Sequence, residues 1–103
     1  MVTQKFTAAN DELRLTGSDG NDSKIGFQLV GLTTGTFVAE ASNDGGTTWV
    51  AMAMYPIAGG AAVASITADG FVYVLAGGMA LVRFRASALS SGTPTGYALP
   101  VLV

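Results

Sequence analysis

The side chains that could do acid–base or nucleophilic chemistry are few in this chain. Its 103 residues include seven carboxylates but no histidine and no cysteine. Cysteine nucleophiles, histidine-based acid–base catalysis and metal binding through these two side chains are therefore excluded. Asp11 and Glu12 are adjacent, so on a strand they face opposite ways, and no two other carboxylates form a convincing catalytic pair. We predict a protein that is not an enzyme, with no catalytic residues and no cofactor.

One loop is a candidate for metal binding. Asp19, Asn21 and Asp22 lie close together between glycines, and Ca²⁺ binds clustered oxygen ligands of this kind. Such loops form far more often without metal, because Asp and Asn side chains bond to the backbone of the turn. The spacing also differs from that of an EF-hand. We therefore predict no bound metal.

The charged residues are scarce and scattered. The five basic residues are Lys5, Arg14, Lys24, Arg83 and Arg85, and the net charge is −2. They are too few to neutralise a nucleic-acid backbone, so we predict no nucleic-acid partner. Only 12% of the residues are charged. Because interface cores are poor in charge, we expect part of the surface to be covered by copies of the chain or by a larger assembly.

The apolar stretches of the chain are interrupted by glycines. A membrane-spanning helix needs about 20 predominantly apolar residues, and no stretch of that kind is present. Residues 1–6 also lack the charged and then apolar pattern of a signal peptide. We predict neither a membrane segment nor a membrane partner.

The chain alternates between turn residues and short strands, which is typical of a sandwich or barrel. In the strands apolar residues recur at every second position, as at Ile25, Phe27 and Leu29. Two runs, residues 71–75 and 97–103, are apolar on both faces, which suggests a second contact surface outside the core. The predicted strands cover residues 3–8, 12–16, 23–30, 35–41, 47–54, 61–67, 70–76, 80–87 and 95–103.

Eight or nine short strands in about 100 residues favour two antiparallel sheets packed face to face. We predict an all-β, jelly-roll-like sandwich, although the strand topology does not follow from the pattern. Residues 1–103 form one domain at this length. Within it, residues 1–22 form an N-terminal arm or an edge strand.

One compact motif is present in the chain. Residues 42–49 read S-N-D-G-G-T-T-W, and their spacing resembles the Asp-box of sialidases, which is a structural turn. The chain is too short for the propeller of those enzymes. A hairpin turn explains the motif: the carboxylate accepts backbone N–H groups, the glycines adopt positive φ, and the tryptophan packs beside the turn. The predicted turn residues are Ser42, Asp44, Gly45, Gly46, Thr48 and Trp49.

The motif belongs to a series of four segments that occur in a fixed order. They are residues 35–49 (GTFVAEASNDGGTTW), 67–71 (TADGF), 81–87 (LVRFRAS) and 91–95 (SGTPT). Together they resemble a class of small virion proteins of tailed bacteriophages, over about residues 23–103. Sequences of this class occur in capsid decoration (cement) proteins and in domains of tail or fibre proteins.

The resemblance implies a structural virion protein on the outer capsid surface. It would bind the major capsid protein and stabilise the shell by bridging capsomers, most simply as a trimer at local threefold sites. The alternatives are a tail or fibre-associated structural domain and a carbohydrate-binding module. In the last case Trp49, Tyr55, Tyr73 and Tyr97 would form a sugar platform, although such aromatic residues are more often core or interface anchors.

The candidate interface residues carry charge or lie on the strands that are apolar on both faces. Arg83 and Arg85 share one strand face, where they could pair with carboxylates of a neighbouring subunit or of the capsid. Alternatively they are solvated, or they pair with Glu40 within the chain. The full predicted set is Arg83, Arg85, Glu40, Tyr97, Leu99 and Val101.

Overall fold

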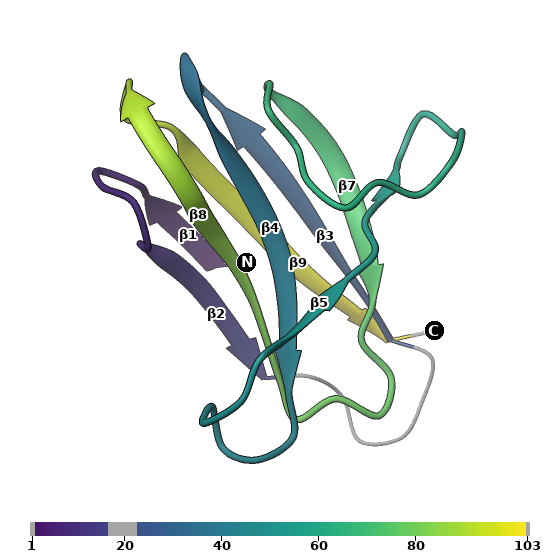
Figure 1. Ribbon diagram of the computed structural model, residues 1–103. Helices are drawn as coiled ribbons and strands as arrows, with labels where there is room; N and C mark the ends of the chain where they lie inside the picture. The colour runs from purple at the N-terminus through teal and green to yellow at the C-terminus, as the bar shows by residue number, and fades with distance from the viewer. Residues whose placement is uncertain (1, 17–22, 103) are drawn as a thin grey trace.

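A computed structural model describes residues 2–16 and 23–102, which form nine strands in two antiparallel sheets (Figure 1). The strands are β1 (Val2–Lys5), β2 (Glu12–Thr16), β3 (Ser23–Val30), β4 (Thr34–Ser42), β5 (Val50–Met52), β6 (Tyr55–Pro56), β7 (Gly70–Leu75), β8 (Leu81–Ser91) and β9 (Thr95–Leu102). The five-stranded sheet has the order β1-β9-β3-β7-β6, and the four-stranded sheet has the order β2-β8-β4-β5. The predicted all-β sandwich is confirmed.

The strand order is that of a jelly roll. Without the short edge strand β6, the two sheets are β1-β9-β3-β7 and β2-β8-β4-β5, the arrangement produced by two interlocked Greek keys. β1 and β2 lie at one edge of each sheet, so the segment before residue 16 supplies two edge strands. Within residues 2–16 and 23–102 there is no helix that is long and apolar enough to cross a membrane.

Alternating side chains fill the space between the sheets. The inner positions of β3, β4 and β8 are occupied by buried residues, whereas their neighbours point outward. The predicted inward residues Ile25, Phe27 and Leu29 are each at most 1% exposed. The other inward residues of these strands are Phe37, Ala39, Ala41, Val82, Phe84 and Ala86.

Four phenylalanine rings join the two sheets. Phe27 of β3 stacks on Phe84 of β8 with ring centroids 4.2 Å apart, and Phe6 meets Phe37 edge to face at 4.7 Å. Gly96 of β9 makes this packing feasible, because a Cβ at that position would lie 2.6 Å from the ring of Phe27. Any larger residue there would force the rings apart.

The prediction was wrong between residues 47 and 67. The predicted strand 47–54 is only β5, and the chain then crosses to the other sheet, where β6 pairs with β7. Met54 is fully buried at this crossing, between the two sheets. No strand covers residues 61–67; Val63 and Ile66 make isolated bridges to Met54 and Phe37. The small, exposed Ala and Ser residues of this segment offer too little apolar surface to hold a continuous strand.

Candidate functional site

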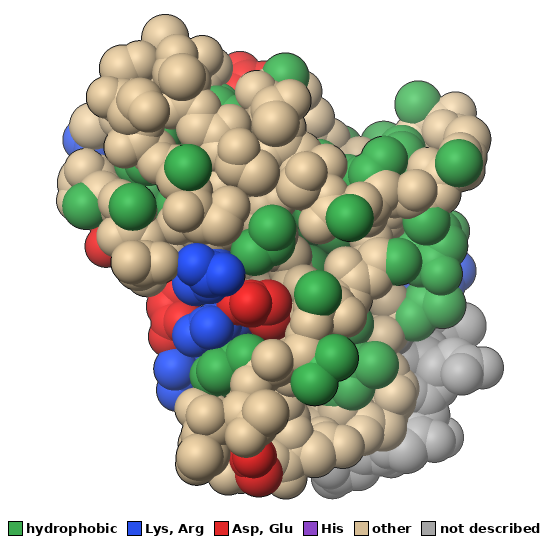
Figure 2. Space-filling view, viewed as in Figure 1, with side chains coloured by type: hydrophobic (Ala, Val, Ile, Leu, Met, Phe, Trp, Pro, Cys, Tyr) green, Lys and Arg blue, Asp and Glu red, His purple; other side chains and the backbone are tan. Residues whose placement is uncertain are grey.

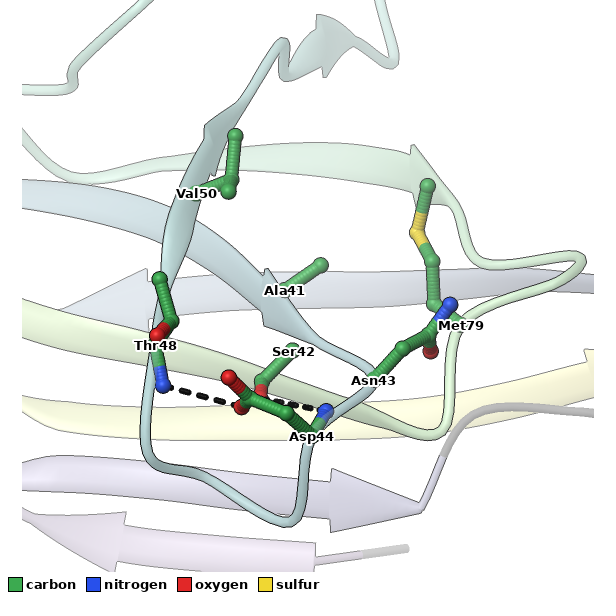
Figure 3. Close-up of a pocket in the computed structure, with 7 residues that line it drawn as sticks. All are labelled: Ala41, Ser42, Asn43, Asp44, Thr48, Val50 and Met79. Atoms are coloured by element: carbon green, nitrogen blue, oxygen red, sulfur yellow. Dashed lines mark hydrogen bonds between the residues drawn. The ribbon is translucent and has the colours of Figure 1, made fainter.

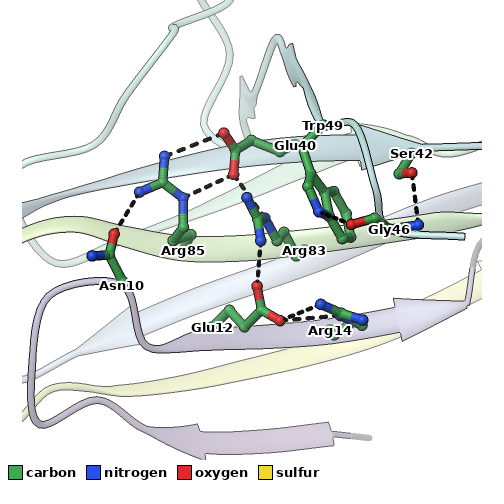
Figure 4. A network of polar contacts seen from close by, with 9 residues as sticks. All are labelled: Asn10, Glu12, Arg14, Glu40, Ser42, Gly46, Trp49, Arg83 and Arg85. Atoms are coloured by element: carbon green, nitrogen blue, oxygen red, sulfur yellow. Dashed lines mark hydrogen bonds and ion pairs between the residues drawn. The ribbon is translucent and has the colours of Figure 1, made fainter. Parts of the chain in front are cut away.

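The outer face of the four-stranded sheet carries a cluster of ion pairs (Figure 4). The Oε1 atom of Glu40 on β4 accepts hydrogen bonds from Nε of Arg83 at 2.8 Å and Nε of Arg85 at 2.9 Å. Glu12 on β2 accepts a further bond from Arg83 at 2.7 Å and pairs with Arg14 at 2.6 Å. The register explains this convergence, because Glu40 lies opposite Arg83 across the β4–β8 ladder.

The electrostatics of the cluster favour its charged form. Hydrogen bonding from Arg85 is the main cause that lowers the pKa of Glu40, and burial opposes it. The same contact raises the pKa of Arg85. Asn10 accepts a remaining N–H of Arg85 at 3.0 Å. The arginines of β8 thus find partners within the chain, as the alternative of a pair with Glu40 predicts.

Trp49 covers one end of this cluster, which we call the arginine cluster (residues 12, 14, 40, 83 and 85). The guanidinium of Arg83 lies 4.1 Å from the ring centroid of Trp49, and that of Arg14 lies 5.1 Å from it. The indole N–H donates to the carbonyl of Gly46 at 2.9 Å. Figure 2 shows the charged side chains of this face gathered together beside hydrophobic ones. Cation–π contact therefore links the cluster to the turn between β4 and β5.

The turn itself is organised by one carboxylate. Oδ1 of Asp44 accepts the backbone N–H groups of Thr47 at 3.1 Å and Thr48 at 2.9 Å, and the hydroxyl of Ser42 at 2.8 Å. These bonds, led by that from Thr48, lower the pKa of Asp44 to about 2. Gly45 and Gly46 adopt positive φ, as the turn requires.

A shallow cleft lies beside this turn (Figure 3). Its volume is about 440 Å³, and its lining residues are Ala41, Ser42, Asn43, Asp44, Thr48, Val50 and Met79. Three of its polar side chains already make hydrogen bonds within the chain. Ser42 and Asp44 bond within the turn, and Asn43 bonds to the backbone at Gly78 and Ala80. The cleft is therefore a by-product of a well-bonded turn, and it does not present polar groups that converge on a ligand.

The outer face of the five-stranded sheet differs in chemistry. The register places Tyr55, Tyr73, Gly26 and Leu99 side by side in one row across β6, β7, β3 and β9. The rings of Tyr55 and Tyr73 stack at 5.3 Å, and the ammonium of Lys24 lies 5.4 Å from the centroid of Tyr73. Apolar and aromatic side chains thus form a continuous band across the sheet.

Large apolar side chains on this face are open to solvent. Leu99 is 51% exposed, Leu75 is 46% exposed and Phe71 is 43% exposed. The ring of Phe71 lies against Gly26, since a Cβ at Gly26 would be 3.3 Å from it. An exposed apolar band on a single sheet face is typical of a surface that another protein covers. We call it the apolar sheet face and define it by residues 24, 26, 55, 71, 73, 75, 97 and 99.

The predicted interface residues fall on opposite sides of the molecule. Arg83, Arg85 and Glu40 belong to the arginine cluster, whereas Tyr97 and Leu99 lie on the apolar sheet face. Val101 pairs with Lys24 along the backbone, and its side chain is outside the part that the structure describes. The candidate metal ligands Asp19, Asn21 and Asp22 also lie outside the described residues.

The aromatic residues do not form one platform. Trp49 lies over the four-stranded sheet, and Tyr55, Tyr73 and Tyr97 lie on the outer face of the other sheet. All four are partly exposed, so none of them is a core residue, and their role as interface anchors stays a prediction. Their polar atoms and flat rings suit half-buried positions on the outside of a sheet.

The sequence interpretation did not single out Glu12, Lys24, Phe71 or Leu75 as site residues. Glu12 joins the arginine cluster only through the β2–β8 pairing, which the sequence does not reveal. For Phe71 and Leu75 a signal was present, because residues 71–75 are apolar at both inward and outward positions. Alternating buried and exposed residues along β7 confirm that this run has an exposed apolar side.

Comparison with solved structures finds a protein of the same fold. The crystal structure of the SPBc2 prophage-derived protein YomS matches with a TM-score of 0.75 and 11% sequence identity, over 96% of this chain and 91% of that one. The chain shares its β-sandwich fold with a prophage-derived protein. No protein-family model and no curated protein sequence matches the chain.

Proposed function

We propose that this chain is a structural virion protein that binds the outer surface of a bacteriophage capsid. In this role it is not an enzyme and needs no cofactor. It binds the major capsid protein and bridges neighbouring capsomers, most simply as a trimer. It acts by binding alone. Because its contacts form only on the assembled shell, their binding energy stabilises the assembled shell.

The observation that carries the proposal is the exposed apolar sheet face on a jelly roll. A monomer of this size seldom leaves Phe71, Leu75 and Leu99 together on one sheet face unless another protein covers them. Two likenesses support a phage context. The fold is that of a prophage-derived protein, and four segments of the sequence resemble phage virion proteins.

A tail or fibre-associated domain is the second candidate, because the same likenesses fit it equally well. The carbohydrate-binding alternative is weakened by the separation of Trp49 from the three tyrosines. The stacked pair Tyr55 and Tyr73 still offers a flat surface on which a sugar could lie. Copy number separates the first two candidates, since decoration proteins cover the whole shell and tail proteins are few.

The proposal is tested by counting and by depletion. Quantitative mass spectrometry of purified particles is expected to give a copy number in the hundreds per particle, and particles lacking the chain are expected to rupture at lower temperature. Adding the purified chain back should restore their stability. Depleted particles that keep full thermal stability but fail to adsorb to cells would replace the capsid function with the tail or fibre alternative.

The trimer is tested separately on the purified chain. Sedimentation at micromolar concentration is expected to show an oligomer, with three copies as the favoured number. The basis is the 24-residue segment 45–68, which has no charged residue and contains the edge strand β5. If the chain is a monomer at high concentration, the trimer is wrong, and contact with the shell alone would account for the low charge of the surface.

A further inference from the structure

We propose that the apolar sheet face is the surface that meets the capsid, and that it binds an apolar patch of the shell protein rimmed by carboxylates. This inference rests on the proposed function and names the contact that the function needs. It assigns the shell contact to β3, β7 and β9 instead of to the arginines of β8.

The face has the composition of an interface core. Three neighbouring strands present aromatic and aliphatic side chains in register, and Gly26 in the middle leaves no protruding side chain. The row beside it contains Phe71, Gln28 and Tyr97, which lie opposite one another across β7, β3 and β9. An apolar patch of this kind excludes water when a complementary surface covers it.

The charges on this sheet have one sign. Lys24 on β3 and Lys5 on β1 point outward, and no Asp or Glu occurs in the described residues of β1, β3, β6, β7 or β9. Lys24 is held over the ring of Tyr73, so its ammonium stays beside the apolar band. Complementary carboxylates must therefore come from the surface that covers the face.

A second copy of this chain does not supply that complement. Of the described carboxylates, Glu12 and Glu40 belong to the arginine cluster on the opposite sheet. Asp11, Asp44 and Asp69 lie in loops, and each accepts two backbone N–H groups there. Two copies packed face to face would bring together two lysines from each copy without one of these carboxylates.

The arginine cluster is less suited to the same partner. The guanidiniums of Arg83 and Arg85 already share Glu40, and Asn10 and Glu12 take further donors. A capsid carboxylate would have to displace these partners, which costs a large part of what the new contact gains. Lys24 and Lys5 have no such carboxylate partner among the described residues.

The experiment is co-sedimentation of purified variants with particles depleted of this chain. The double variant Leu75→Glu/Leu99→Glu is expected to lower affinity about 100-fold, because it buries charge in the interface core. Lys5→Glu/Lys24→Glu is expected to lower it about tenfold, with the largest difference at low salt. Ser90→Glu, which adds charge to an exposed position of β8, is the matched control and should bind as wild type does.

The outcomes separate the two proposals. Wild type that fails to bind depleted particles overturns the capsid function and the shell contact with it. Wild type that binds while both double variants bind equally well overturns the assigned face alone. Sedimentation of the free chain adds a third readout: if Leu75→Glu/Leu99→Glu dissolves the oligomer, the face binds a second copy and the inference is wrong. Circular dichroism confirms that each variant is folded.

Discussion

The two outer faces of this sandwich follow the same alternating pattern of side chains but differ in what they present to solvent. On the four-stranded sheet, the charged side chains of the arginine cluster pair with one another, and Trp49 covers one end of the cluster. On the five-stranded sheet, apolar side chains lie open to solvent, and the ammonium of Lys24 lies over the ring of Tyr73. The charged groups of the first face find partners within the chain, whereas we expect another protein to cover the apolar side chains of the second.

This difference shows that charge does not by itself mark a binding surface. The arginines attract attention in the sequence because paired Arg residues suit interfaces. In the fold, Arg83 and Arg85 already pair with Glu40, and Arg83 also pairs with Glu12, so we expect these contacts to contribute to stability. The apolar sheet face has the opposite property: its large apolar side chains are exposed, and we expect them to add little to the stability of the fold. Substitutions on the two faces should therefore separate stability from binding.

The largest stability effect is expected from Glu40→Ala. Removing this carboxylate leaves Arg83 and Arg85 partly buried without their shared acceptor, which should cost about 2–3 kcal/mol of unfolding free energy. Urea unfolding at fixed protein concentration measures it. Glu40→Gln keeps one acceptor oxygen and should cost less. An unchanged midpoint for Glu40→Ala would mean that the cluster is only a set of solvated charges.

Trp49→Ala should have the next largest effect. The ring is half-buried, donates to Gly46 and stacks under Arg83, so its loss should cost about 2 kcal/mol. Trp49→Phe keeps a ring under the guanidinium but loses the hydrogen bond, and it should retain most of the stability. Thermal melts of both variants give the comparison. If Trp49→Ala melted like wild type, the indole would have no structural role at the turn.

The pH dependence of stability should change with Asp44→Asn. The folded-state pKa of Asp44 is about 2, below its ordinary value of 3.8, so the unfolded chain binds protons more readily. The stabilisation from this group is present above pH 4 and is lost as the pH falls towards 2. Wild-type melting temperature should drop over that window, and Asp44→Asn should show a shallower drop. Equal slopes would show that other carboxylates dominate.

The smallest stability effect is expected on the apolar sheet face. Leu99→Ser removes an exposed side chain, so the unfolding free energy should change by no more than about 0.5 kcal/mol. The same variant should weaken binding to particles, which makes it the reverse of Glu40→Ala. A stability loss as large as that of Glu40→Ala would mean that this face supports the fold and is not reserved for a partner.

Local patterns in the sequence account for much of this structure. Alternation at Ile25, Phe27 and Leu29 is sufficient to assign the inner face of β3, because a strand turns successive side chains to opposite sides. The residue types at 42–49 likewise account for the hydrogen bonds of the turn, since each is made between residues close in the chain.

Long-range pairing is what the sequence could not supply. Glu12 meets Arg83 only because β2 and β8 are neighbours, 71 residues apart in the chain. The strand prediction for residues 47–67 failed for a related reason. The chain crosses from one sheet to the other at Met54, so the apolar residues before and after this point pack in different sheets. Such pairings decide which outer face remains exposed to solvent. The candidate interface therefore could not be predicted from the sequence alone.

The position of β9 has a consequence for the order of events during synthesis. This strand lies between β1 and β3, and its residues Gly96 and Ala98 complete the wall of the core around Phe27. While a ribosome is still making residues 95–102, β3 has an open edge and β1 has no strand to pair with. Folding must therefore wait until β9 has left the ribosome tunnel, and it then proceeds through distant pairings that form slowly. In that interval the β3 edge of the nascent chain is open to pairing with other chains.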